Sequence, residues 1–135
     1  MAVILIIDDD AAVSASLQFL LEADGHEVLA AGDCLAGLAL YRANEPPIVI
    51  TDLIMPGRVG LEVIDELKSL APTVSIIAIS GGGRSGNSDI LELARARGAD
   101  EVLAKPFEPE TLLELIQRMA AAQPYNPPDG RGREG

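Results

Sequence analysis

The sequence is poor in aromatic residues and in cysteine, and both shortages limit what the chain can be. Only 3% of its 135 residues are aromatic although 48% are hydrophobic, so the core must be built from aliphatic side chains. Cys34 is the single cysteine, which excludes an internal disulfide and a cysteine metal cluster. We therefore expect one domain from a reducing, cytoplasmic setting, with Cys34 half-buried.

Basic residues and long hydrophobic runs are also scarce. Ten Lys and Arg face 21 Asp and Glu, which gives a formal net charge of -11. This balance disfavours binding of nucleic acid or an anionic membrane by the chain itself, and it suits a metal ion or a cationic partner. No apolar run approaches the length of a membrane span, and no basic segment precedes the first one, so we expect neither a membrane helix nor a signal peptide.

What the chain has instead is an alternation of short apolar segments and helical patterns. The segments are β-branched and bounded by turn residues, which is typical of buried strands. They are residues 3–7, 27–31, 48–52, 74–80 and 101–104. An amphipathic helical pattern follows each of them, so the chain reads as (βα) repeated five times. This predicts an α/β fold with a doubly wound, five-stranded parallel sheet covered by helices on both faces.

Local signals place several boundaries within this plan. Asp10 and Asp33 are predicted helix N-caps, and Pro109 suits the first turn of the last helix. His26, between a helix and a strand, is predicted to be exposed. We assign residues 1–122 to a single domain and the Pro- and Gly-rich residues 123–135 to a disordered tail or linker stub.

Chemically active residues follow four of the five predicted strands. Asp8 and Asp9 follow the first strand, Asp52 ends the third, Ser80 ends the fourth and Lys105 follows the fifth. Parallel strands bring these positions to one edge of the sheet. Crowded carboxylates repel one another, and a divalent cation with oxygen ligands, Mg²⁺ or Mn²⁺, relieves the repulsion. Together with a hydroxyl and an ammonium group, the acids suit transfer of a phosphoryl group to a carboxylate.

Four motifs at these strand ends carry a resemblance to a known family. They are IIDDD (6–10), ITDLIMPGRVG (50–60), AIS (78–80) and GADEVLAKPF (98–107). With these four motifs in this order, the chain resembles the receiver domain of bacterial two-component response regulators. The resemblance implies a flavodoxin-like fold with strand order 2-1-3-4-5. It also implies phosphorelay signalling, with a histidine kinase or histidine phosphotransfer protein as donor and a downstream protein that binds the last two strands and helices.

The resemblance also implies roles for individual residues around a metal ion. Asp52 matches the phosphoacceptor of the family. Asp9 matches a direct Mg²⁺ ligand, Asp8 matches an acid that holds the metal through water, and the main-chain carbonyl of Ile54 matches the remaining protein ligand.

Further matches concern the response to phosphorylation. Ser80 matches the switch hydroxyl and Lys105 the lysine that neutralises the phosphoryl group. Val102 stands at a second switch position, where the family usually has an aromatic ring. Pro106 follows the peptide bond that is usually cis in the family. The stretch after Ser80 is longer than is typical, and its glycines predict a mobile loop over residues 81–86.

Two other functions compete with this interpretation. A degenerate receiver would act only as a protein-interaction module, and Val102 keeps that alternative open. An Mg²⁺-dependent phosphatase with an aspartyl-phosphate intermediate would commonly carry a second acid two residues after the nucleophile. Here that position is Ile54, which cannot transfer a proton. We therefore expect a signalling domain whose only chemistry is self-catalysed phosphorylation and dephosphorylation, and not an enzyme.

Overall fold

The computed structural model describes residues 2–55, 58–59, 61–80, 87–105 and 107–122. Three expectations concern residues outside these ranges: the mobile loop over 81–86, the cis peptide before Pro106 and the tail over 123–135. Within the part that is described, no helix is both long and apolar enough to cross a membrane.

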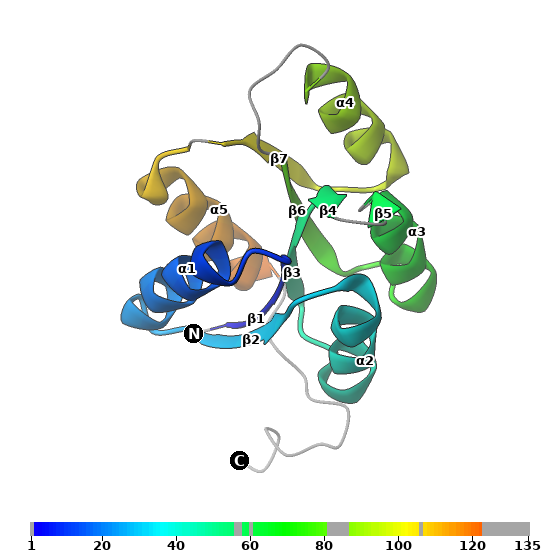
Figure 1. Ribbon diagram of the computed structural model, residues 1–135. Helices are drawn as coiled ribbons and strands as arrows, with labels where there is room; N and C mark the ends of the chain where they lie inside the picture. Colours follow the sequence, from blue (N-terminus) through cyan, green and yellow to red (C-terminus); the bar gives the residue numbers. More distant parts are fainter. Residues whose placement is uncertain (1, 56–57, 60, 81–86, 106, 123–135) are drawn as a thin grey trace.

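The centre of the molecule is a five-stranded parallel sheet (Figure 1). Its strands are β1 (Val3–Ile7), β2 (Glu27–Ala31), β3 (Ile48–Asp52), β6 (Ser75–Ser80) and β7 (Glu101–Ala104). Their spatial order is β2-β1-β3-β6-β7, which confirms the predicted order 2-1-3-4-5 because β6 and β7 are the fourth and fifth strands of this sheet. The strand order reverses between β1 and β3, and in open parallel sheets ligands bind beyond the carboxyl ends of the strands at such a point.

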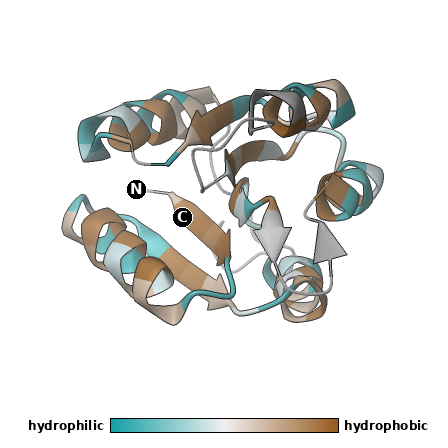
Figure 2. Ribbon diagram, turned by 45° about the horizontal axis from the view of Figure 1, so that its top comes forward, coloured by the Kyte–Doolittle hydropathy of each residue, from teal (hydrophilic) through white to brown (hydrophobic). Residues whose placement is uncertain are grey.

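Two layers of helices cover the sheet. The helices are α1 (Ala11–Ala23), α2 (Cys34–Asn44), α3 (Leu61–Leu70), α4 (Asn87–Arg97) and α5 (Pro109–Ala122). Buried side chains of α1 and α5 pack on one face of the sheet, and those of α2, α3 and α4 pack on the other. Figure 2 shows the hydrophobic residues concentrated on the strands and on the helix faces that meet them.

Burial differs between the central and outer strands of the sheet. Every residue of β1, β3 and β6 is buried, as expected for unbroken apolar runs covered on both faces. The outer strand β2 has two buried, one intermediate and two exposed residues, and β7 is only partly buried. The three central strands therefore form the anchored part of the sheet.

A small hairpin that the sequence does not predict follows β3. Strand β4 (Ile54–Met55) pairs in antiparallel fashion with β5 (Arg58–Val59). Two-residue strands leave too little alternation to be seen as a pattern, because strand prediction depends on runs of at least four residues.

Both predicted N-caps are confirmed. Asp10 accepts hydrogen bonds from the amides of Ala12 and Val13 at the start of α1, and the Asp33 carboxylate accepts one from the Ala36 amide at 2.8 Å. These bonds satisfy amides that have no partner within the helix.

Asp33→Ala should therefore lower the free energy of unfolding by about 1 kcal/mol, since alanine cannot accept the amide hydrogen bond. Urea unfolding followed by circular dichroism measures the loss. Asp33→Ser, which keeps a capping oxygen, should retain most of the stability. Equal losses in both variants would show that the carboxylate acts through its charge and not as a cap.

The structure corrects two burial predictions. His26 is only 9% exposed: its Nδ1 accepts a hydrogen bond from the Ala2 amide at 3.0 Å, and its Nε2 lies 3.3 Å from the Asp24 carboxylate. The ring is covered because it bridges the start of β1 and the turn before β2. Cys34 is 3% exposed, hence fully buried and not half-buried, because it opens α2 on the side that packs against the sheet.

Candidate functional site

Two neighbouring strands carry carboxylates to one edge of the sheet. Asp8 directly follows β1, Asp52 ends β3, and Ile7 pairs with Thr51 in the parallel register between them. One oxygen from each of Asp8, Asp9 and Asp52 lies within 4.8 Å of the others. The three acids that the sequence predicts to meet are thus brought together at the carboxyl ends of the strands.

The three consecutive acids after β1 have different surroundings. Asp8 is buried, and its Oδ1 accepts a hydrogen bond from the Asp10 amide at 2.9 Å. The Asp10 carboxylate instead accepts hydrogen bonds from the first amides of α1. Asp9 is exposed. The first acid is therefore fixed, the third begins the helix, and the second is accessible from solvent.

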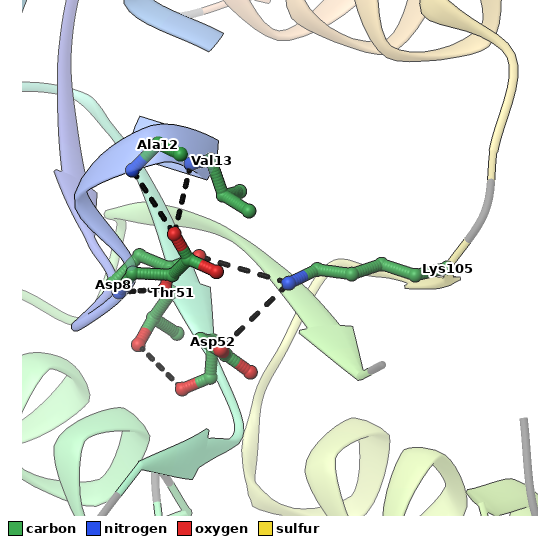
Figure 3. A network of polar contacts seen from close by, with 7 residues as sticks. Asp8, Ala12, Val13, Thr51, Asp52 and Lys105 are labelled. Carbon is green, nitrogen blue, oxygen red and sulfur yellow. Dashed lines mark hydrogen bonds and ion pairs between the residues drawn. The ribbon is translucent and has the colours of Figure 1, made fainter. Parts of the chain in front are cut away.

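Lys105 directly follows the outer strand β7, and its side chain reaches the acids. Its backbone amide donates to the Ser80 carbonyl at 2.9 Å, which continues the pairing of β6 with β7. Its Nζ lies 3.8 Å from Oδ2 of Asp8 and 3.8 Å from Oδ2 of Asp52 (Figure 3). One ammonium group therefore bridges two carboxylates, and the cluster of four side chains keeps a net negative charge.

Burial makes these charges interact strongly. Asp8 is 5% exposed and Asp52 is 8% exposed, while the Lys105 side chain is 27% exposed. Two unit charges about 4 Å apart interact with about 4 kcal/mol at an effective dielectric constant near 20. The site thus holds a surplus of repelling negative charge that a cation would neutralise.

The donor set fits Mg²⁺. This ion prefers oxygen ligands. Asp8, Asp9 and Asp52 each offer one carboxylate oxygen, and these three atoms lie within 4.8 Å of one another. Ile54, whose carbonyl is a further predicted ligand, lies two residues after Asp52 at the start of β4. Its role as a ligand stays a prediction.

The predicted switch residues lie on β6 and β7, the two strands that follow β3 in the order of the sheet. Ser80 ends β6 and is fully buried, and it pairs with Ala104 of β7. The residue before it, Ile79, is the register partner of Asp52. Val102 lies on β7 and is partly buried against the core on the α2, α3 and α4 side. Their roles in switching stay predictions.

One further residue at the site was not predicted from the sequence. Thr51 is fully buried in β3, and its Oγ1 donates a hydrogen bond to the main-chain carbonyl of Asp52 at 3.2 Å (Figure 3). Threonine is an ordinary residue of strands, so its presence in a β-branched run carries no separate signal.

Comparison with known proteins gives a consistent result. The family described as response regulator receiver domain matches residues 4–117. Protein PilH of Pseudomonas aeruginosa is 36% identical over 121 residues, which are 90% of this chain and 99% of PilH. Response regulator MprA of Mycolicibacterium vanbaalenii is 37% identical over 130 residues, but the chain spans only 54% of that protein. The chain likewise spans about half the length of several other regulators that it matches.

Solved structures agree with the sequence comparison. A receiver domain protein from Clostridium thermocellum superposes with a TM-score of 0.83 at 35% identity, covering 90% of this chain and 96% of the other. The receiver domain of NtrX from Brucella abortus gives a TM-score of 0.82 at 30% identity and covers 89% and 99% of the two chains.

Proposed function

Because the chain belongs to the response regulator receiver domain family, we propose that Asp52 is its phosphoacceptor, charged by a histidine kinase or a histidine phosphotransfer protein. The observation that supports this most directly is the meeting of Asp8, Asp9 and Asp52 with the Lys105 ammonium at the carboxyl edge of the sheet. Asp52 is the acid at the end of the central strand β3, which pairs with β1 on one side and with β6 on the other.

In the proposed reaction a carboxylate oxygen of Asp52 attacks phosphorus as the bond from phosphorus to the histidine nitrogen of the donor breaks. The product is an acyl phosphate on Asp52 and a free imidazole on the donor. Lys105, already 3.8 Å from the Asp52 carboxylate, would neutralise one phosphoryl oxygen. Asp8, Asp9, Asp52 and the Ile54 carbonyl would hold Mg²⁺, which supplies further charge neutralisation when bound.

The output of this reaction is a change of charge at the sheet edge. A phosphoryl group adds about 1.5 to 2 negative charges and three acceptor oxygens. The Ser80 hydroxyl would donate to one of them. Val102, at the second switch position, has no aromatic ring that could move inward in response. A downstream protein would then recognise the altered surface of β6, β7, α4 and α5, in the cytoplasm.

The competing enzymatic function is not needed to explain the site. A phosphatase would require a proton donor beside the leaving group, and Ile54 occupies the position two residues after Asp52. We therefore expect stoichiometric phosphorylation and slow self-catalysed loss, without multiple turnover of a phosphate ester such as p-nitrophenyl phosphate. The complete set of acids equally argues against a receiver that has lost phosphorylation.

The test is chemical mapping of the acceptor. The protein is incubated with phosphoramidate, whose phosphorus–nitrogen bond resembles that of phosphohistidine, with Mg²⁺ or with EDTA. Borohydride then reduces an aspartyl phosphate to homoserine, which peptide mass spectrometry locates. We expect homoserine at position 52 in the Mg²⁺ sample alone. Reduction at Asp8 or Asp9, or no labelling with Mg²⁺ present, would refute the assignment.

A further inference from the structure

The peptide group that leaves β3, between Asp52 and Leu53, is held at both of its ends. Its N–H, on Leu53, donates to the Ile79 carbonyl of β6 at 2.8 Å. Its carbonyl, on Asp52, accepts the hydrogen bond from the Thr51 hydroxyl at 3.2 Å (Figure 3). One bond comes from the neighbouring strand and the other from the side chain of the preceding residue, so rotation of this peptide would break both.

The surroundings of Thr51 make its hydroxyl notable. Thr51 is fully buried, and its register partners are Ile7 on β1 and Ala78 on β6, both members of the apolar core on the α2, α3 and α4 side. Valine has nearly the same shape and would suit such a position in a strand. A buried hydroxyl is unfavourable unless it is hydrogen-bonded, so the bond to the Asp52 carbonyl is what makes threonine acceptable here.

This peptide lies between two of the proposed metal ligands. The carboxylate of Asp52 precedes it, and the carbonyl of Ile54 follows it by one residue. A rotation of the peptide changes the backbone angles of Asp52 and Leu53 together, and therefore moves one ligand relative to the other. Mg²⁺ tolerates little departure from octahedral geometry, so a small displacement weakens its binding.

We propose that Thr51 is a positioning residue whose hydroxyl fixes the peptide between Asp52 and Leu53, and thereby sets the spacing between the Asp52 carboxylate and the Ile54 carbonyl for Mg²⁺. This inference rests on the proposed function, because it assumes that these two groups share a metal ion. Without the hydroxyl, the Asp52 carbonyl loses this hydrogen bond, so the peptide is held less firmly.

Two substitutions separate the hydroxyl from the bulk of the side chain. Thr51→Val keeps the volume and removes the hydroxyl, whereas Thr51→Ser keeps the hydroxyl and removes a methyl group. Because the chain has no tryptophan, titration calorimetry with MgCl₂ is the suitable measurement. We expect the dissociation constant to rise about tenfold in Thr51→Val and to stay within threefold of wild type in Thr51→Ser.

The outcomes distinguish this inference from the function on which it rests. A purely structural role would weaken binding in proportion to lost packing, so it would affect the serine variant at least as much as the valine variant. That result, or a valine variant within twofold of wild type, would overturn the positioning role while leaving the metal site intact. If the wild-type protein itself binds no Mg²⁺, the metal site and the positioning role both fail. Should Thr51→Val not fold, Thr51→Ala gives a second variant without the hydroxyl, with the same expected loss.

Discussion

Asp52→Asn should eliminate the acid-labile phosphoryl label and, in the absence of metal, should make the protein more stable. The label is lost because an amide oxygen is a poor nucleophile toward phosphorus and would not form a stable acyl phosphate. The gain in stability follows from the crowding of charges: Asp52 is repelled by Asp8 and Asp9 and attracted by Lys105 alone among the four side chains of the cluster. We expect a net increase of about 1 kcal/mol in the free energy of unfolding, after screening by solvent.

Adding Mg²⁺ should reverse this order of stability. A ligand that binds only the folded state stabilises it by about 2.7 kcal/mol when its concentration is one hundred times its dissociation constant. The wild-type site gains this amount, whereas the variant, with one carboxylate fewer, binds the ion more weakly and gains less. Urea unfolding of both proteins, with EDTA and with saturating MgCl₂, measures the two orders.

Asp33→Asn is the matched control for this experiment. It removes the same charge at an exposed helix N-cap, where asparagine caps as well as aspartate. Labelling and the response to Mg²⁺ should both be unchanged in it. If Asp52→Asn were less stable than wild type in EDTA, attraction to Lys105 would outweigh the repulsion among the acids.

Gly37→Ala should destabilise the protein by about 1–3 kcal/mol, although alanine normally favours a helix over glycine by about 1 kcal/mol. A Cβ atom at this position of α2 would lie 2.5 Å from Cδ1 and 2.7 Å from Cγ1 of Ile7. Ile7 is fully buried between β2 and β3, so its side chain has no space to move aside. Because Ile7 directly precedes Asp8, a shift of β1 should also weaken Mg²⁺ binding.

Gly32→Ala serves as the control for that substitution, since a Cβ atom there would meet no other atom within 4 Å. Its stability should stay within about 0.5 kcal/mol of wild type. Thermal unfolding of the three proteins, followed by Mg²⁺ titration, tests both effects. A Gly37→Ala variant as stable as wild type would mean that α2 can move away from the sheet without loss.

The main site was predictable because parallel strands convert positions in sequence into positions in space. Asp8 and Asp52 are 44 residues apart, yet each follows an apolar run, and neighbouring parallel strands end at one edge. Burial of His26 could not be predicted in this way, since it depends on an amide near the start of β1, 24 residues earlier. The proposed role of Thr51 could not be predicted for another reason. Its hydrogen bond depends on the side-chain rotamer, and the residue pattern of a strand does not specify rotamers.

Because the central and outer strands differ in burial, the acids and the lysine of the site are attached to strands that are held with different firmness. The carboxylates are attached to β1 and β3, which are enclosed on both faces and flanked by strands on both edges. Lys105 continues β7, an outer strand with one free edge and partial cover. We therefore expect an anion attached at the site to displace Lys105 and β7 toward the acids, because β7 is less firmly held than β1 and β3.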